Sequence, residues 1–339
     1  MKDFMEHAII KQNVGIDIAK DNFKVCFSIT TSNLSTKVLG SRTFSNHYKG
    51  FKEFVDWLSR KRKSSDDVYF TMEATGVYYE NLAYYLWQEP SFRIQIVLPN
   101  KVKNYGKSLD IKSKTDKIDA AILARCGLER ALRVWYPISP NLLELKQLTR
   151  ERDATSRSRT SASNRLHAAQ HQGNPNKKVI VRTKAQIALF DKQIKGIEKE
   201  IKALVNQDEN LKKKFAYLTS IPGVGLITAA VIVAETNGFE TFTNIKQLTS
   251  YAGLDVKIVE SGKWKGKSRI SKQGNSHIRK ALYMPSMSRV RYDKGAKRFY
   301  ENLNTRKGNA MSALVAVQRK MLGLMFSLWK NQQMYSAPD

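Results

Sequence analysis

Two short apolar runs, each with a carboxylate at its end, constrain the fold of this chain more than any other feature. The first run, residues 13–19, contains Asp17, and the second, residues 68–72, leads directly into Glu73. Short apolar runs followed by turn residues are typical of buried strands. A carboxylate in such a place is costly unless it is exposed or bound to something. The pattern therefore predicts a sheet that presents acidic side chains at one edge.

The segments around these two runs predict a mixed α/β domain of the RNase H-like (RuvC-like) kind. They are expected strands at 23–29, 37–44 and 92–98, and expected helices at 50–60, 78–88 and 115–130. Three strands followed by alternating helices and strands is the order of that sheet. In this order the first and fourth strands are neighbours, which would bring Asp17 and Glu73 together.

A second acidic pair, Asp116 and Asp119, lies in the expected helix 115–130. Residues three apart share one side of a helix, so this helix could carry both carboxylates over the strand ends. Carboxylate oxygens are the ligands that Mg²⁺ prefers in proteins. For Asp116, a structural role as the acid that caps the helix remains open.

The charge of the chain indicates a polyanionic partner. Lys and Arg number 58 against 30 Asp and Glu, a net charge of +28, and the excess is spread along most of the sequence. Long nucleic acid is the commonest partner of so basic a chain, and a ribosomal-type or merely solubilised surface is the alternative. Cys26 and Cys126 predict neither a disulfide framework nor a zinc cluster. No apolar signal core is apparent and no run approaches the ~18 apolar residues of a membrane span, so we expect a cytosolic, nucleoid-associated protein without a membrane partner.

The middle of the chain predicts a long helical coiled-coil arm. Pro137 and Pro140 end the first unit, and an apolar seam of heptad spacing follows. The seam consists of Ile187, Phe190, Ile194, Ile197, Ile201 and Leu204. Its partner could be residues 141–171, with 173–176 as the turn, or a second chain. Both interpretations remain open.

The last third predicts a helical domain with two candidate contacts to nucleic acid. Gly223 and Gly225 bracket a valine between helical segments, as in a helix-hairpin-helix element whose backbone N–H groups hold a phosphate. An ordinary helical corner is the alternative. Residues 257–280 then hold eight Lys or Arg and one acid, Glu260. In this basic loop we single out Ser261, Trp264 for stacking on bases, and Lys267, Arg269 and Lys272 for holding a phosphate.

Several short blocks, in this order, resemble the DEDD-type insertion-sequence transposases, which are bridge-RNA-guided recombinases with a RuvC-like N-terminal domain and a serine-bearing C-terminal transposase domain. The blocks are Gly15-Ile16-Asp17-Ile18-Ala19-Lys20, Met72-Glu73-Ala74-Thr75-Gly76, Lys114-Thr115-Asp116-Lys117-Ile118-Asp119-Ala120, Ser220-Ile221-Pro222-Gly223-Val224-Gly225, Tyr251-Ala252-Gly253-Leu254, Glu260-Ser261-Gly262 and Ser271-Lys272-Gln273-Gly274-Asn275. Two departures stand beside them: members often have proline after the Ala-Gly-Leu element, where Asp255 stands here, and arginine where Gln273 stands.

The resemblance implies a DEDD metal site formed by Asp17, Glu73, Asp116 and Asp119, and Ser261 as the nucleophile. It also implies target and donor DNA, a structured noncoding guide RNA, and a dimer or tetramer in which the acidic site and the serine of one catalytic centre come from different protomers. The expected domains are a RuvC-like domain at 1–138, a helical arm at 139–212 and a transposase domain at 213–339.

The expected reaction is phosphodiester exchange through a phosphoserine link. A serine hydroxyl needs a base or a metal to become a good nucleophile, and two Mg²⁺ ions, or Mn²⁺, held by the four carboxylates would meet that need. Two rival functions remain. One is an RNase H-like nuclease or junction resolvase that uses water, and the other is a non-enzymatic nucleic-acid scaffold.

Overall fold

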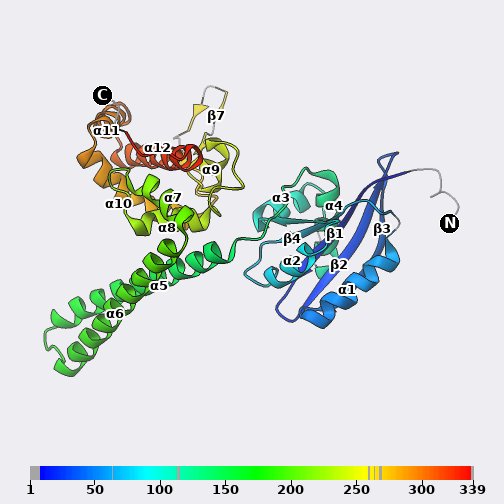
Figure 1. Cartoon of the computed structure of the whole chain (residues 1–339), viewed down its shortest axis with the longest axis horizontal. Coiled ribbons are helices and arrows are strands. Elements are labelled where there is room, and N and C mark those ends of the chain that lie inside the picture. Colours follow the sequence, from blue (N-terminus) through cyan, green and yellow to red (C-terminus); the bar gives the residue numbers. More distant parts are fainter. Residues whose placement is uncertain are drawn as a thin grey trace. The chain divides into compact units, whose positions relative to one another are not determined.

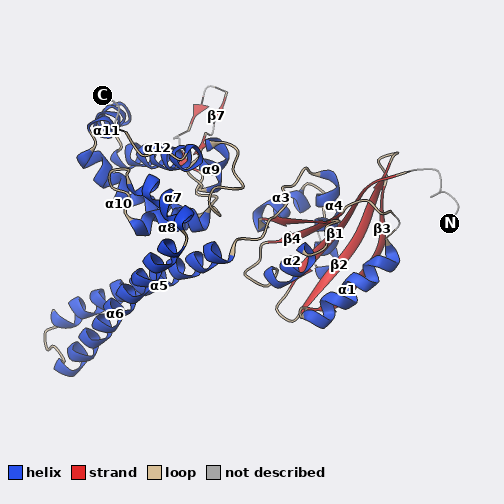
Figure 2. Ribbon diagram, in the orientation of Figure 1, coloured by secondary structure: helices blue, strands red, loops and turns tan. Residues whose placement is uncertain are grey.

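The computed structural model of the chain has two compact units, Met1–Pro137 and Ile138–Asp339 (Figure 1). Strands of a large sheet lie in the first unit, whereas the second is almost entirely helical (Figure 2). The structure describes residues 8–62, 64–111, 113, 115–258, 260–262, 264–266 and 269–336.

The first unit is built on a five-stranded mixed sheet with the order β3-β2-β1-β4-β5. β2 runs antiparallel to both β1 and β3, and β4 runs parallel to both β1 and β5. The first and fourth strands are therefore neighbours, as the sequence predicted, and the sheet is consistent with an RNase H-like core. The strands are β1 (Ile9–Ile18), β2 (Asn22–Thr31), β3 (Thr36–Ser45), β4 (Val68–Glu73) and β5 (Phe92–Val97).

The two faces of this sheet are covered by different helices. One face carries Val14, Ile16 and Phe70, which belong to a buried cluster with side chains of α1 (Tyr48–Lys61) and α2 (Glu80–Trp87). The opposite face is covered by α4 (Asp116–Glu129), which follows the short helix α3 (Pro99–Lys107). Successive side chains of a strand point to opposite faces. The odd-numbered residues of β1 and β4 therefore face α4.

Gly15 lets α4 lie directly against β1. A Cβ atom at this position would be 2.1 Å from both the carbonyl oxygen of Ala120 and the backbone nitrogen of Ala124. Gly127, one turn further along α4, makes the same close approach to the side chains of Asn13 and Thr71. At Gly15 the helix backbone and the strand thus touch without an intervening side chain, which fixes the position of α4 over β1.

The second unit begins with a helical hairpin. α5 (Pro140–Gln170) and α6 (Lys177–Gln207) lie side by side and are joined by a short turn (Figure 1). Of the predicted seam, the part next to the helical bundle is buried and the part toward the turn is only half-buried. The seam therefore has a partner within the chain, namely α5. A dimer through the hairpin stays a prediction.

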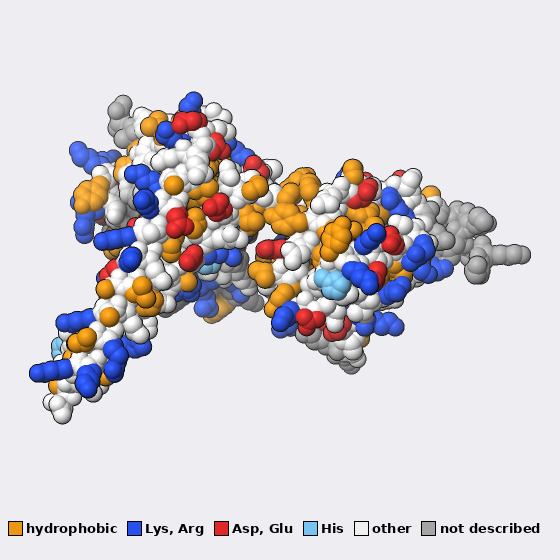
Figure 3. All heavy atoms as spheres, turned by 60° about the horizontal axis from the view of Figure 1, so that its bottom comes forward, with side chains coloured by type: hydrophobic (Ala, Val, Ile, Leu, Met, Phe, Trp, Pro, Cys, Tyr) orange, Lys and Arg blue, Asp and Glu red, His pale blue; other side chains and the backbone are white. Residues whose placement is uncertain are grey.

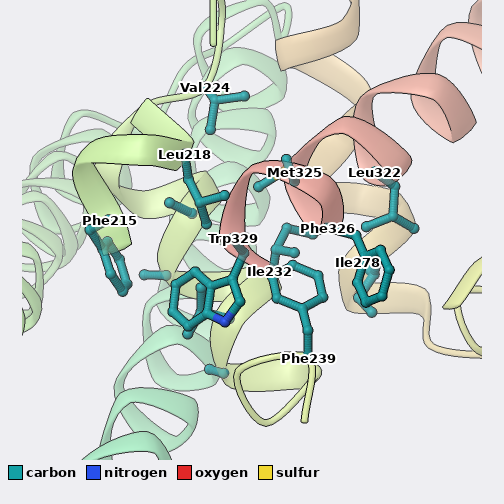
Figure 4. Packing of buried hydrophobic residues seen from close by; sticks show 14 of the residues in the cluster. Phe215, Leu218, Val224, Ile232, Phe239, Ile278, Leu322, Met325, Phe326 and Trp329 are labelled. Atoms are coloured by element: carbon teal, nitrogen blue, oxygen red, sulfur yellow. The ribbon is translucent and has the colours of Figure 1, made fainter. Parts of the chain in front are cut away.

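The rest of the second unit is a helical bundle around α12. Trp329 and Phe326 of this helix pack against Phe215 and Phe239, and the surrounding apolar residues complete the core (Figure 4). Among the described residues α12 alone is long and apolar enough to cross a membrane, but half of that stretch is buried in this core. The helices are α7 (Glu209–Thr219), α8 (Leu226–Glu235), α9 (Ile245–Tyr251), α10 (Ser276–Tyr292), α11 (Lys294–Lys307) and α12 (Ala310–Asn331).

Replacement of Gly15 by alanine should destabilise the first unit by about 3 kcal/mol or more, because the added methyl group overlaps helix backbone that cannot rotate away. The measurement is chemical unfolding followed by circular dichroism. The control is Gly196→Ala, at an exposed site in α6 where a Cβ meets nothing within 4 Å. That change should stabilise its helix by about 1 kcal/mol. Equal effects of the two substitutions would contradict the close contact.

Candidate active site

Asp17 and Glu73 lie at the adjoining ends of two neighbouring parallel strands. Ile16 of β1 is paired with Met72 of β4, so the next residue on each strand is a carboxylate. Both side chains are half-buried. As odd-numbered residues they point toward the face that α4 covers. The alternation of each strand is therefore what delivers the two acids to the same corner of the sheet.

The first turn of α4, the helix that covers this face of the sheet, carries a third carboxylate. Asp119 is half-buried and directly precedes Ala120, whose carbonyl oxygen lies against Gly15, two residues before Asp17. Asp116 also belongs to the first turn but is exposed. It does not cap the helix. Thr115 does, and its hydroxyl accepts a hydrogen bond of 3.3 Å from the backbone of Ile118, so the interpretation of Asp116 as the capping acid is wrong.

The donor chemistry of this corner suits a hard divalent cation, since all the candidate ligands are carboxylate oxygens. The carboxylate side chains do not converge on one point. Among the described residues, no three His, Cys, Asp or Glu side chains form a group that could hold a metal ion. Glu73 accepts a hydrogen bond of 2.8 Å from the hydroxyl of Thr75. The backbone thus presents the acids on one face, and metal ligation by them stays a prediction.

A buried polar network behind this corner was not found from the sequence. The Asn13 side-chain amide donates to the backbone carbonyl of Ala124 at 2.7 Å, and its oxygen lies 3.0 Å from the hydroxyl of Thr71, which donates to it. Thr71 also lies 3.2 Å from the side-chain oxygen of Gln95. These bonds join β1, β4 and β5 to α4. In the sequence, the one sign of this network was Asn13, a polar residue at the start of an otherwise apolar run.

Ser261 sits near the tip of a small two-stage hairpin in the second unit. β6 (Val256–Lys257) pairs with β9 (Arg269–Ile270), and further out β7 (Glu260–Ser261) pairs with β8 (Trp264–Lys265). Ser261 is exposed and pairs with Trp264, which is 59% exposed. A serine hydroxyl beside an open aromatic ring is accessible to a large substrate.

The other predicted contacts of this loop are placed as follows. Arg269 and Lys272 are exposed, and the backbone nitrogen of Lys272 donates to the carbonyl of Gly253 at 3.1 Å. Lys267 lies outside the described residues. The roles of all three in holding a phosphate stay predictions.

The two glycines of the proposed hairpin element differ in what they do. Gly223 has a φ of +90°, and a Cβ there would lie 2.6 Å from the carbonyl oxygen of Pro285 in α10. It is therefore required for packing, as in an ordinary helical corner. Gly225 precedes α8 as its N-cap and has open space around the position of a Cβ. Phosphate binding at this helix end stays a prediction.

The arginines of α5 are engaged with neighbouring side chains. Arg150, Arg152, Arg157, Arg159 and Arg165 bond respectively to Glu235, Glu198, Asp153, Asp191 and Gln186. Four of these arginines therefore tie α5 to α6 or to the bundle.

Replacement of Asn13 by alanine should lower the free energy of unfolding by about 1–3 kcal/mol, because the carbonyl of Ala124 and the hydroxyl of Thr71 lose a buried partner. The comparison is Asn104→Ala, at an exposed position of α3, which should change the stability by less than about 0.5 kcal/mol. Chemical unfolding of both variants gives the two values. Equal stabilities of the two variants would show that the network does not hold α4 in place.

Comparison with known proteins places these features in a family. A DEDD-type family model described as a transposase matches residues 14–175, and a second, described as the transposase IS116/IS110/IS902 family, matches residues 216–301. The pilin gene-inverting protein of Moraxella bovis is 29% identical over 323 residues, which cover 94% of this chain and 95% of the relative. The transposase for insertion sequence element IS1111A of Coxiella burnetii is 23% identical over 352 residues, covering 95% of this chain and 90% of the relative.

The first model spans the strand-end carboxylates and the first turn of α4, and the second spans the turn at Gly223 and the Ser261 hairpin. Both parts of the chain that carry candidate chemistry are therefore parts that the family shares. This chain belongs to the IS116/IS110/IS902 family of transposases and is a DNA transposase or recombinase.

Proposed function

We propose that this chain cuts and rejoins target and donor DNA through a serine nucleophile, with the strand-end carboxylates holding divalent metal. The observation that carries the proposal is the close contact at Gly15. It holds Ala120, the residue after Asp119, against β1 two residues before Asp17, and Asp17 and Glu73 end neighbouring strands there. Carboxylates from three separate stretches of sequence on one face of a sheet would suit a divalent cation, which prefers oxygen ligands.

In the proposed reaction the Ser261 hydroxyl oxygen attacks a phosphorus atom of the DNA backbone. The bond to one deoxyribose oxygen breaks, that oxygen leaves as a hydroxyl, and the strand stays linked to the protein as a phosphoserine. A hydroxyl of a partner strand then attacks the same phosphorus and restores the serine. Because phosphodiester bonds are exchanged and not hydrolysed, the reaction requires no nucleotide cofactor. The exposure of Ser261 supports this role.

Asp17, Glu73 and Asp119 would hold the metal, with Asp116 as the outer member of the set. A bound Mg²⁺ or Mn²⁺ supplies charge stabilisation to the phosphate and activates a nearby hydroxyl. Family resemblance assigns the carboxylates and the serine of one catalytic centre to different protomers, so we infer a dimer or tetramer. Within one chain, each group is positioned by its own unit.

We infer that a guide RNA supplies most of the sequence choice and that the protein binds both nucleic acids mainly through charge. The net charge of +28 and the exposed lysines of α6, such as Lys184, Lys192 and Lys199, support this view, and Figure 3 shows basic side chains along the hairpin of α5 and α6. Gly225, Trp264, Arg269 and Lys272 are the proposed local contacts, together with Gly223 and Lys267. The Moraxella relative, by its name, inverts a pilin gene, which accords with joining two DNA sites. A cytoplasmic place of action follows from this role.

Replacement of Ser261 by alanine should abolish strand exchange and the covalent protein–DNA adduct, because no other group then carries the strand. The measurement is denaturing electrophoresis of protein incubated with flanking DNA, guide RNA and Mg²⁺. The control is Ser250→Ala, at an exposed site on α9, which should leave the adduct unchanged. A Ser261→Ala protein that still cuts DNA would establish a nuclease that uses water.

Divalent metal should raise the unfolding midpoint of the first unit, and Asp17→Asn should abolish that rise. Binding to the folded state alone stabilises by about 2.7 kcal/mol at a hundredfold excess over the dissociation constant. The measurement is thermal unfolding with and without Mn²⁺. Asp21→Asn, at an exposed turn next to the strand end, serves as the control and should keep the full rise. An undiminished rise in Asp17→Asn would contradict the proposed ligand set.

A further inference from the structure

A buried carboxylate in the second unit lies at the meeting point of three separate segments. Glu235, at the end of α8, is only 4% exposed. Arg150 of α5 donates to its two carboxylate oxygens at 2.8 and 3.1 Å, and the side-chain amide of Asn275 donates to one of them at 2.7 Å. The hydroxyl of Tyr251, at the end of α9, donates to the backbone carbonyl of Glu235 at 3.0 Å.

This carboxylate is held in its charged form. Burial by itself would raise the pKa of Glu235, but the hydrogen bonds from Arg150 and Asn275 outweigh it and keep the pKa below its ordinary value. Well-packed apolar side chains would stabilise such a site at least as well as a buried ion pair. The arrangement therefore calls for a reason other than stability. The places in the chain of the residues that bond to Glu235 indicate that reason.

Of these residues, Asn275 bonds to the carboxylate from one end of the segment that presents Ser261, and Tyr251 bonds to the backbone of Glu235 from the other end. Tyr251 stands immediately before the segment and Asn275 immediately after it, and the backbone nitrogen of Asn275 donates to the carbonyl of Tyr251 at 2.8 Å. Asn275 also caps α10, because its side-chain oxygen accepts from the backbone nitrogens of His277 and Ile278. The side chain of Asn275 thus joins α10, the segment's end and Glu235.

The base of the segment is closed tightly above this point. A Cβ on Gly274 would lie 2.4 Å from the backbone nitrogen of Gly253, so the two chain segments of the base touch there. Ser271 bonds to Asp255 through both its side chain and its backbone nitrogen. The paired β6 and β9 follow directly, and then β7 with Ser261. A displacement at the base would therefore be carried along the hairpin to the serine.

Helix α5 makes a second contact near Asn275, with the start of α10. Asp153, three residues after Arg150, forms an ion pair with Lys280 and lies 3.9 Å from Nδ1 of His277, both in the first turns of α10. One face of the arm helix therefore binds the Glu235 carboxylate through Arg150 and the start of α10 through Asp153. Helix α5 is therefore linked to Asn275 through Glu235, and to the helix that follows Asn275 through Lys280.

We propose that Glu235 is a positioning residue, which ties the arm helix α5 to both ends of the Ser261 hairpin so that the arm sets where the serine stands. The inference rests on the proposed role of Ser261 as the nucleophile. Glu235 itself touches no substrate in this scheme. It acts through Asn275 and Tyr251, and a shift of the arm on binding nucleic acid or another protomer would reach the hairpin through Arg150.

The test uses Asn275→Ser in the full-length protein. Serine still caps α10 but is too short to reach Glu235. We expect the single-turnover rate of adduct formation at saturating DNA to fall by about tenfold or more, since small displacements of reacting groups are costly. We expect DNA affinity to stay within about twofold, and hydrogen exchange in β6 and β9 to become faster. Asn309→Ser, which changes the exposed cap of α12 in the same way, should leave all three unchanged.

Two variants of Arg150 test the same contact independently, in case Asn275→Ser impairs folding. Arg150→Ala should slow the adduct and loosen β6 and β9, and Arg150→Lys should recover part of both effects, because lysine restores the charge with one donor group in place of the fork. Adduct rates and exchange that match the wild type in Asn275→Ser or in Arg150→Ala would overturn the inference. The same holds if Arg150→Lys is no better than Arg150→Ala.

The two proposals fail in different ways. If Ser261→Ala retains strand exchange, the nucleophile assignment is wrong, whereas the exchange rates of β6 and β9 in Asn275→Ser still report whether Glu235 holds the hairpin. If Ser261→Ala is inactive and Asn275→Ser is fully active, the nucleophile stands and the positioning role of Glu235 falls.

Discussion

The contact between α4 and β1 at Gly15 is the constraint on which the proposed chemistry of the first unit depends. Because glycine has no side chain, the helix backbone rests on the strand, and the atoms that would meet a Cβ are backbone atoms of Ala120 and Ala124. The sheet could exist with a looser helix on this face. The first turn of α4, with its two acids, would then no longer be held next to β1. Asn13 and Thr71 reinforce the same contact from behind.

In the second unit, too, a buried contact holds the part of the chain that carries the candidate residue. Its exposed candidate group, Ser261, stands on a short hairpin that has little core of its own, and short isolated hairpins are only marginally stable in water. The base of that hairpin is held by Asn275 and Tyr251 on Glu235, a buried anion anchored by α5. In each unit, then, the chain around the candidate residues is held by a buried contact several residues away from them.

The sequence predicted those parts of the fold that local patterns encode. The apolar runs of β1 and β4 identified the strands and placed Asp17 and Glu73 at their ends, and the spacing of Asp116 and Asp119 placed both on one side of α4. The order of the segments predicted that β1 and β4 are neighbours. Heptad spacing found the seam of α6, although it could not tell the intramolecular partner α5 from a second chain.

The parts that the sequence did not predict depend on contacts between distant residues. Glu235 and Arg150 are 85 positions apart, and Asn13 and Ala124 are 111 apart, so no local pattern links them. Arg150 was one basic residue among many on a helix, and only the fold shows that its partner is a buried acid. Gly223 looked like part of a phosphate-binding turn, but its packing against Pro285 gives it a structural role as well.

The most direct test of the metal site is a crystal structure of the protein grown with Mn²⁺ and measured at a wavelength where manganese scatters anomalously. We expect an anomalous peak at the ends of β1 and β4, within ligand distance of Asp17, Glu73 and Asp119. A fully occupied ion bound elsewhere, with these three carboxylates apart, would contradict the account.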